Sequence, residues 1–209
     1  MPDFELEDTY NGIVAGVDEA GRGPWVGPVV AGCAVFLTRD VNQKLLNELN
    51  DSKKLSKKKR EELYDLLMKE KAKGTMLLGI GEASAKEIDE INILNASFLA
   101  MKRAIEQAKV HADLVLVDGN REPKDFGCEV KAVVKGDAKS YSIAAASILA
   151  KVYRDHLMEK MALKYNGYGF EKNAGYGTKT HVEGLKKYGV TPEHRRSYAP
   201  IKKFLEETL

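Results

Sequence analysis

The sequence predicts an α/β domain built around one mixed sheet of five strands that is flanked by helices. Three observations predict this class. Five short apolar stretches have the length of strands, and the one over 28–37 is also rich in valine. Three longer segments carry apolar residues at helical spacing, and strands and helices alternate in the second half of the chain. We expect one domain over 1–209, with about 165–209 as a small C-terminal helical and loop extension.

A glycine-rich turn joins the first two predicted strands. The apolar run over 13–17 ends on Asp18 and Glu19, and the turn over 21–24 has the sequence Gly-Arg-Gly-Pro. Residues 28–37 are apolar and rich in valine, which is typical of a central strand. The two segments therefore resemble a pair of strands joined by a tight loop.

The middle of the chain predicts two helices and a strand. Ser56 can cap a polar helix over about 57–71, whose buried stripe consists of Leu63, Leu66 and Leu67. A third strand is expected over 76–81. A second helix over about 93–107 carries apolar residues at spacings of four, three and four, namely Leu94, Phe98, Met101 and Ile105.

Two further strands and a long helix follow. The strand over 114–117 ends on Asp118, and the strand over 130–134 is followed by Lys-Gly-Asp at 135–137. The long helix over about 139–164 has an apolar line made of Ile143, Ala146, Ala150, Tyr153, Leu157 and Met161. After it come a loop rich in tyrosine and glycine, which we expect to form an open working surface, and two short helices near 179–187 and 201–207.

Composition limits the possible environments of the chain. There are 33 basic and 31 acidic residues, so the net charge of +2 does not indicate a particular partner. No apolar stretch approaches the roughly 18 residues of a membrane span. The first residues carry neither a basic segment nor an apolar run, so we expect no secretory signal. Cys33 and Cys128 lack the spacing of a zinc site or a disulfide framework. We expect a cytoplasmic monomer without membrane contact.

Four acidic residues lie at the ends of predicted strands: Asp18, Glu19, Asp118 and Asp137. Strand ends commonly form the functional crevice of an α/β sheet. Carboxylates gathered there repel one another, and a hard divalent cation such as Mg²⁺ or Mn²⁺ would remove this penalty. Two such ions could activate a water and stabilise the leaving oxygen of a phosphodiester. The alternative is that each acid only forms a turn or caps a helix.

Other residues could bind a nucleic acid. The glycines at 21 and 23 would let the backbone approach an anion or a sugar, although a tight turn also explains them. Two groups of basic residues could contact phosphates or simply be solvated: Lys53, Lys54, Lys57, Lys58, Lys59 and Arg60, then Lys151, Arg154, His194, Arg195 and Arg196. Tyr176 lies between two glycines, which favours an exposed ring that can stack on a sugar or base over a buried tyrosine.

Five motifs in order resemble the bacterial type 2 ribonuclease H family, ribonuclease HII. They are 18–24 (DEAGRGP) with 27–28 (GP), 50–56 (NDSKKLS), 118–121 (DGNR), 135–137 (KGD) with 142–152 (SIAAASILAKV), and 194–197 (HRRS). The resemblance covers about 13–202. It implies a ribonuclease H-like fold.

The resemblance also implies a role for each matching residue. Asp18, Glu19, Asp118 and Asp137 match the family's catalytic, metal-binding carboxylates, for which two Mg²⁺ or Mn²⁺ ions are expected during catalysis. Gly21, Arg22 and Gly23 match the loop that contacts a ribonucleotide 2′-hydroxyl. Lys53 matches a lysine that contacts a backbone phosphate, and Tyr176 matches a tyrosine that stacks on the next deoxyribose.

The implied activity is hydrolysis of the RNA strand of RNA–DNA hybrids and incision on the 5′ side of single ribonucleotides in duplex DNA, leaving 3′-hydroxyl and 5′-phosphate ends. Such an enzyme removes misincorporated ribonucleotides and RNA primers during DNA repair and replication, and its C-terminal extension contributes to substrate binding. Two departures from the family pattern stand out. Asn173-Ala174 replaces a more basic pair, and Trp25 either lines the substrate groove or packs inside.

Two rival functions are compatible with part of this pattern. One is a nuclease or phosphotransferase of the same fold that acts on DNA alone. The other is a nucleic-acid-binding module without catalytic activity, in which the acids are structural. A magnesium-dependent cut in a duplex that contains one ribonucleotide, and not in all-DNA, separates the three.

Overall fold

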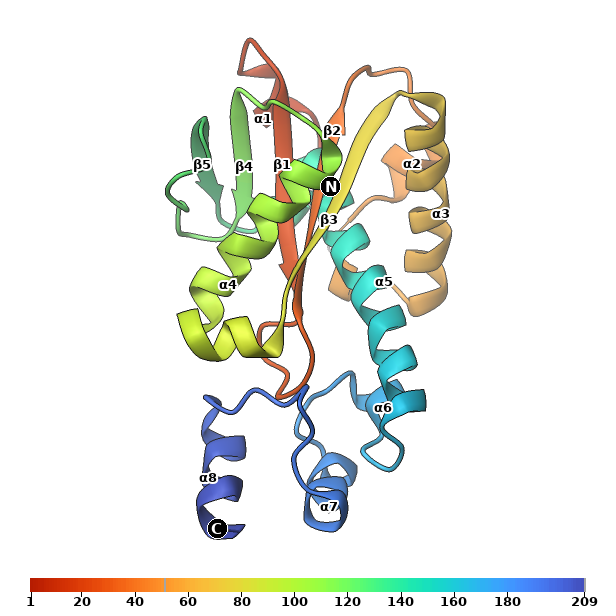
Figure 1. Cartoon of the computed structure of the whole chain (residues 1–209). Coiled ribbons are helices and arrows are strands. Elements are labelled where there is room, and N and C mark those ends of the chain that lie inside the picture. Colours follow the sequence, from red (N-terminus) through yellow and green to blue (C-terminus); the bar gives the residue numbers. More distant parts are fainter. Residues whose placement is uncertain (51, 209) are drawn as a thin grey trace.

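A computed structural model describes residues 1–50 and 52–208, so Asp51 of the motif at 50–56 lies outside the described residues. It confirms the α/β fold around a mixed five-stranded sheet of order β3-β2-β1-β4-β5 (Figure 1). The strands are β1 (Val14–Ala20), β2 (Val29–Phe36), β3 (Met76–Ala83), β4 (Leu114–Asp118) and β5 (Glu129–Val133). The first three pair antiparallel, whereas β4 runs parallel to β1 and β5 parallel to β4.

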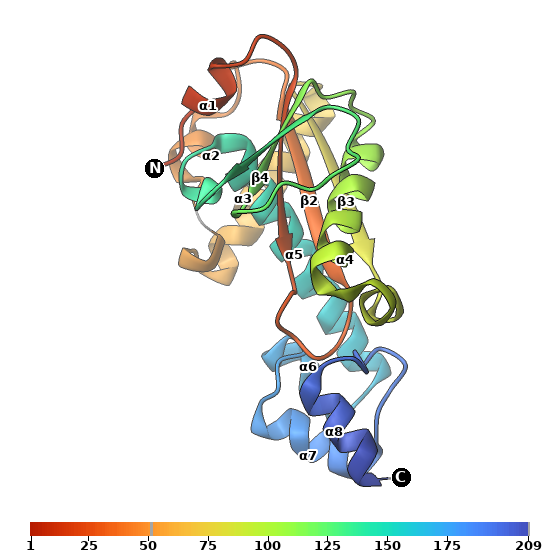
Figure 2. The ribbon, with the colours of Figure 1, turned by 90° about the vertical axis from the view of Figure 1, so that its left-hand side faces the viewer.

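Helices cover both faces of the sheet (Figures 1 and 2). They are α1 (Glu5–Asp8), α2 (Gln43–Glu48), α3 (Lys57–Lys73), α4 (Ala85–Ala108), α5 (Tyr141–Lys164), α6 (Phe170–Asn173), α7 (Lys179–Tyr188) and α8 (Ala199–Thr208), with 3₁₀ turns η1 (Ser52–Lys54) and η2 (Gly136–Ala138). One apolar core lies between the sheet and α4, and another between the sheet, α3 and α5. The predicted helices are confirmed, but α1, α2 and α6 are too short to show a helical period in the sequence.

The helix predicted over about 93–107 begins earlier, at Ala85. Ser84 and Glu87 form a capping box, in which each side chain accepts a hydrogen bond from the other residue's backbone N–H. The helix is interrupted at Asn92, where φ is +66°. Its buried face also differs from the predicted one: Met101 is buried, but Leu94, Phe98 and Ile105 are only half-buried, and the closest neighbours of the sheet are alanines.

Glycines in the strands explain this preference for small residues. A Cβ atom added to Gly81 would lie 2.1 Å from the Ala100 carbonyl oxygen of α4. On the opposite face, a Cβ added to Gly32 would lie 2.2 Å from the Ala146 carbonyl oxygen of α5. Both helices therefore rest directly on strand backbone. This close packing fixes the sheet whose ends carry the predicted acids.

The last three helices form a small unit beyond one end of the sheet (Figures 1 and 2). Its core combines Val26 of the loop between β1 and β2 with Met158 of α5 and with four later residues, Tyr168, Phe170, Leu185 and Ile201. The loop after Asn166 is thus only partly the open surface that its composition predicts. Tyr168 and Phe170 are buried with stacked rings, whereas Tyr176 is 52% exposed. The role of 165–209 in substrate binding stays a prediction.

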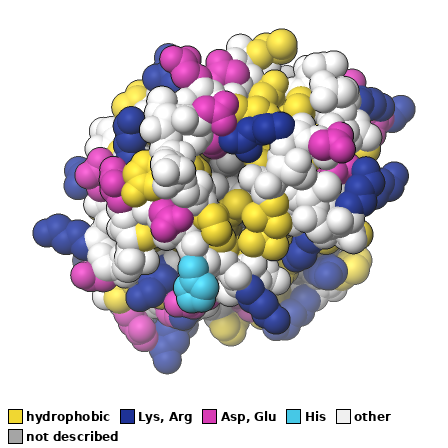
Figure 3. Space-filling model, turned by 90° about the horizontal axis from the view of Figure 1, so that it is seen from above, with side chains coloured by type: hydrophobic (Ala, Val, Ile, Leu, Met, Phe, Trp, Pro, Cys, Tyr) yellow, Lys and Arg dark blue, Asp and Glu magenta, His cyan; other side chains and the backbone are white. Residues whose placement is uncertain are grey.

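Among the described residues, no helix combines the length and the apolar character that a membrane span requires. Cys33 and Cys128 are free thiols, and burial raises the pKa of Cys33 to about 12. Figure 3 views the molecule from the end opposite to the C-terminal unit, where acidic and basic side chains are interspersed. Cys33 is fully buried on β2.

Two buried histidines lie in the core of the C-terminal unit. The Nε2 atoms of His181 and His194 are 3.1 Å apart, and His194 Nδ1 accepts a hydrogen bond from the Thr191 N–H. The bond between the two Nε2 atoms requires one of them to be unprotonated, so both rings cannot carry a charge together. Burial and the neighbouring His181 lower the pKa of His194 to about 3. The unit is therefore assembled around two neutral imidazoles.

This arrangement predicts a loss of stability in mild acid. The folded-state pKa of His194 lies below its unfolded value, so stability is complete above about pH 6.5 and falls as pH drops towards 3. For His194 alone, the free energy of unfolding should fall by about 2 kcal/mol between pH 7 and pH 5. Urea unfolding at both pH values measures this difference.

His194→Gln should remove most of that pH-dependent loss, although the variant is less stable at pH 7. His111→Gln is the matched control, because His111 is exposed and should leave the pH dependence unchanged. An equal pH dependence in wild type and His194→Gln would contradict the assignment.

Candidate active site

The pairing of β1 with β4 places two of the predicted acids side by side. The parallel register pairs Val17 with Val117, so Asp18 and Asp118 follow at the same end of neighbouring strands. The strand β1 continues through Glu19 to Ala20, so the acids belong to the strand rather than to the turn that follows it. Asp18 is 7% exposed, and its Oδ1 accepts a hydrogen bond of 2.7 Å from the Glu19 N–H.

The fourth predicted acid approaches from β5. After this strand the chain turns back, and the Gly136 N–H donates a 2.7 Å hydrogen bond to Asp118 Oδ1. Asp137 is the next residue, lies in η2 and is buried. Three strand ends therefore converge, as the sequence predicts. The assignment of these four residues as metal ligands stays a prediction.

The electrostatics of this cluster are unfavourable for carboxylates. Burial raises the pKa of Asp18 well above its ordinary value, and the negative charges of Glu19 and Asp118 raise it further. Burial also raises the pKa of Glu19, against the effect of Arg22, whose guanidinium lies 3.1 Å from Glu19 Oε1. The charge of Lys53 lowers the pKa of both Asp18 and Glu19.

The donor chemistry at this site fits a hard divalent cation. Among the described residues, no group of three or more His, Cys, Asp or Glu side chains is already arranged to hold a metal ion. The acids at the strand ends nonetheless offer only oxygen ligands. A bound cation would offset both the repulsion between these carboxylates and the cost of burying their negative charge. Mg²⁺ and Mn²⁺ prefer carboxylate oxygens as ligands.

The loop over 21–28 is attached to the protein through its carbonyl groups. Arg195 donates hydrogen bonds to the carbonyl oxygens of Gly21 at 2.6 Å, Arg22 at 2.9 Å and Gly27 at 3.0 Å. Gly21 has a φ of +95°, and a Cβ atom there would lie 2.0 Å from Arg154 Nε. Glycine is therefore required both by the backbone conformation and by the space.

Tyr176 lies against this loop. A Cβ atom added to Gly23 would lie 3.3 Å from Tyr176 Cε1, so the ring stands beside the predicted glycine loop. The Tyr176 carbonyl oxygen is 3.0 Å from His181 Nδ1, which connects it to the buried histidine pair. The predicted sugar-contacting residues are therefore gathered on one surface next to the acids, with Tyr176 exposed as its glycine neighbours indicate.

The two departures from the family pattern have structural roles. Asn173 Nδ2 donates to the Tyr168 carbonyl oxygen and to Thr178 Oγ1, and its Oδ1 accepts from the Gly175 N–H. It therefore shapes the turn that carries Tyr176. Trp25 packs against Gly177, where a Cβ atom would lie 1.9 Å from the indole ring, and also against His181. Of the two alternatives for Trp25, the structure supports packing.

Three basic residues that the sequence placed among possible phosphate contacts are instead buried. Arg154, His194 and Arg195 are 2%, 1% and 0% exposed. The two arginines donate to backbone carbonyl groups, and His194 contacts His181 and the Thr191 N–H. These side chains therefore cannot reach a phosphate. Among the basic residues at 194–196, only Arg196 is exposed. The structural role of Arg154 and Arg195 could not be predicted from the sequence, because charged side chains are usually exposed.

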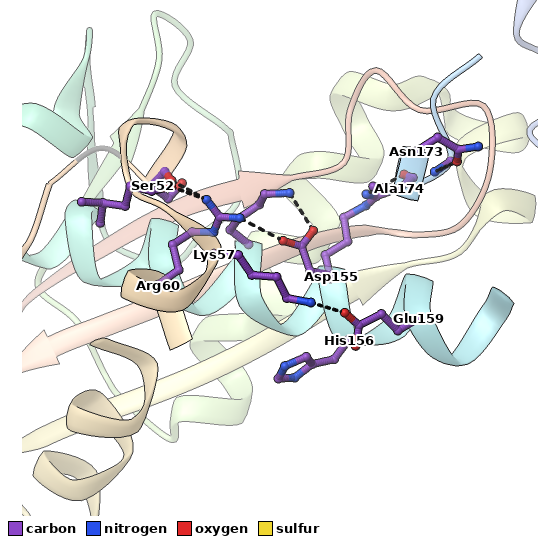
Figure 4. Close-up of polar contacts among 12 residues, drawn as sticks. Ser52, Lys57, Arg60, Asp155, His156, Glu159, Asn173 and Ala174 are labelled. Atoms are coloured by element: carbon purple, nitrogen blue, oxygen red, sulfur yellow. Dashed lines mark hydrogen bonds and ion pairs between the residues drawn. The ribbon is translucent and has the colours of Figure 1, made fainter. Parts of the chain in front are cut away.

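The first basic cluster is largely paired within the protein. Arg60 donates to the Leu55 carbonyl oxygen at 2.6 Å and to that of Ser52 at 3.2 Å, and it also reaches Asp155 on α5 (Figure 4). Lys57 pairs with Glu159. These contacts hold the segment 52–55, which carries Lys53, against α5. Arg60 therefore holds the segment that carries Lys53, whereas Lys57 joins the start of α3 to α5.

Comparisons with known proteins agree with this architecture. A family profile described as ribonuclease HII matches residues 15–201. The ribonuclease HII of Gluconobacter oxydans is 50% identical over 206 residues, which are 99% of this chain and 97% of that protein. That of Rhodospirillum rubrum is 51% identical over 205 residues, covering 98% and 92%. The crystal structure of ribonuclease H2 from Pyrococcus horikoshii superposes with a TM-score of 0.73 at 32% identity, covering 93% of this chain and 98% of that one.

Proposed function

The chain belongs to the ribonuclease HII family and is thus a ribonuclease H that hydrolyses phosphodiester bonds, and from this premise we propose its substrates and mechanism. It cuts the RNA strand of RNA–DNA hybrids and incises on the 5′ side of single ribonucleotides in duplex DNA. The products carry 3′-hydroxyl and 5′-phosphate ends. In the cell it acts as a cytoplasmic monomer that removes misincorporated ribonucleotides and RNA primers during DNA repair and replication.

One observation carries the proposal. The strand-end acids lie beside a surface formed by the 21–23 loop and Tyr176, so a site suited to phosphate chemistry adjoins a site suited to sugars. The 2′-hydroxyl is the group that distinguishes RNA from DNA at a given position. A nuclease that needs this hydroxyl requires both sites at a short and fixed separation.

The acids would hold the metal cofactor: Asp18, Glu19, Asp118 and Asp137. Two Mg²⁺ or Mn²⁺ ions, when bound, supply a water of lowered pKa and neutralise charge on the leaving 3′-oxygen. The chain's own residues orient the substrate around that centre. The backbone of Gly21 and Gly23 and the side chain of Arg22 contact the ribose.

Lys53 and Tyr176 complete the binding of the strand. Lys53, whose charge already acts on Asp18 and Glu19, contacts a backbone phosphate next to the acids. The exposed ring of Tyr176 stacks on the deoxyribose that follows the ribonucleotide. Glu19 holds the Arg22 guanidinium and so links the loop to the catalytic acids.

The first prediction concerns the acids. Asp118→Asn keeps the shape of the side chain but removes a negative charge needed to hold the cofactor, so cleavage should fall by at least about 1,000-fold. Binding of the duplex should survive at least in part. Cleavage of an end-labelled duplex with one ribonucleotide, with Mg²⁺ and with chelator, measures the first quantity, and a gel-shift assay measures the second.

Asp65→Asn is the matched control, because Asp65 is exposed on α3. It should cut at the wild-type rate. Wild-type turnover by Asp118→Asn would refute the metal-binding role, and cleavage of an all-DNA duplex by the wild type would favour the rival DNA nuclease.

The second prediction concerns Tyr176. Tyr176→Ala removes the stacking surface. Stacking of an aromatic ring on a base is worth about 1–3 kcal/mol, and a loss on the same scale would lower kcat/KM on a single-ribonucleotide duplex by about 10- to 100-fold. The loss on a uniform RNA–DNA hybrid should be smaller, because a hybrid offers a productive register at each nucleotide. Tyr188→Ala is the control, since Tyr188 is similarly exposed at 53% but lies away from the loop. Equal losses on both substrates would count against sugar stacking.

A further inference from the structure

We infer that Arg154 is a positioning residue that sets the spacing between the 21–28 loop and the segment that carries Tyr176. The inference rests on the proposed function, because the two segments are the proposed readers of adjacent sugars. In this inference, one buried side chain fixes the distance between the loop that contacts the ribose and the tyrosine that stacks on the next deoxyribose.

The contacts of the guanidinium carry this inference. Arg154 lies on α5 and is 2% exposed. Its Nε donates to the Pro28 carbonyl oxygen at 3.3 Å and its Nη2 to that of Val26 at 3.2 Å, both in the loop. Its Nη1 donates to the Ala174 carbonyl oxygen at 3.1 Å, two residues before Tyr176. One planar group therefore binds both segments at a fixed separation.

The shape of the contact leaves little freedom for either segment. A Cβ atom at Gly21 would lie 2.0 Å from Arg154 Nε, so the loop rests directly on the guanidinium. On the other side, Ala174 adopts a φ of +49°, and the Asn173 hydrogen bonds hold the following turn. The Trp25 N–H also donates to the Gly175 carbonyl oxygen at 2.9 Å. The loop and the turn with Tyr176 therefore form one rigid surface for binding adjacent sugars, and Arg154 lies beneath it.

The charge of Arg154 is placed unusually for a structural residue. Within the part of the chain that the structure describes, neither Arg154 nor the equally buried Arg195 forms an ion pair. Burying a cation without a carboxylate partner is costly, and a neutral donor could hold a carbonyl group at lower cost. Beneath a surface that faces a phosphate backbone, however, two cations attract the ligand without contacting it.

The spacing matters most for a single ribonucleotide. On a hybrid, every nucleotide of the RNA strand carries a 2′-hydroxyl, so a shifted or loosened site still finds a productive register. On a duplex with one ribonucleotide, only one register is productive, and the ribose and the next deoxyribose must be bound together. A change that alters the distance between the loop and Tyr176 should therefore affect single-ribonucleotide cleavage selectively.

The test compares wild type with Arg154→Lys on both substrates. Lysine keeps the positive charge but cannot bridge three carbonyl groups with a planar fork. We expect kcat/KM on the single-ribonucleotide duplex to fall by about 10- to 100-fold, while the loss on the hybrid stays several times smaller. Arg103→Lys is the matched control, because Arg103 also holds a backbone carbonyl, that of Glu82, but lies on α4. The ratio of the two activities should be unchanged in this control.

A double-mutant cycle separates positioning from general stability. If Arg154 acts through Tyr176, the selective losses of Arg154→Lys and Tyr176→Ala should not add in the double variant. Asn173→Ala, which loosens the same turn from the other side, should reproduce the selective loss even if Arg154→Lys folds poorly. Equal losses on both substrates in Arg154→Lys and Asn173→Ala, or additive effects in the cycle, would overturn the inference.

The outcomes for the two proposals are distinguishable. Failure of the wild type to cut the single-ribonucleotide duplex would defeat the proposed function itself. If the wild type cuts both substrates and the Arg154→Lys ratio equals the wild-type ratio, only the positioning role of Arg154 fails.

Discussion

The repulsion among the carboxylates gathered at the ends of β1 and β4 is the constraint on which the site depends. Parallel pairing places Asp18 and Asp118 at neighbouring strand ends, and the return of the chain after β5 brings Gly136 and Asp137 to the same place. Burial alone would favour neutral acids there. The protein tolerates this arrangement because the strands are locked by helices that touch their backbone, so the acids cannot move apart.

The rest of the molecule can be understood as a support for what lies beside these acids. The loop over 21–28 is held from below by Arg154 and Arg195, and the turn with Tyr176 by Asn173 and the histidine pair. The C-terminal unit therefore does more than close the fold. Its core contains Val26 of the loop, so the loop is anchored in the same cluster that fixes the turn of Tyr176.

Much of this architecture could be predicted from the sequence. The five strands follow from short apolar runs, α3 follows from its leucine stripe and its cap Ser56, and α5 follows from its apolar spacing. The first third of α4 lies outside the predicted range, although Ser84 and Glu87 carry a capping-box signal, because the helix is interrupted at Asn92. The convergence of the strand-end acids followed from the α/β class, but their role as metal ligands remains a prediction.

What could not be predicted depends on partners that lie far away in the sequence. Arg154 and Arg195 are buried only because loop carbonyls more than a hundred residues away face them. The same contacts have an electrical consequence for the surface above. A carbonyl that points inward turns the negative end of its peptide dipole away from a polyanion, and a fixed dipole attracts phosphate without an exchangeable ion pair. If the loop binds the proposed substrate, part of that attraction is independent of the counterion release that makes lysine contacts sensitive to salt.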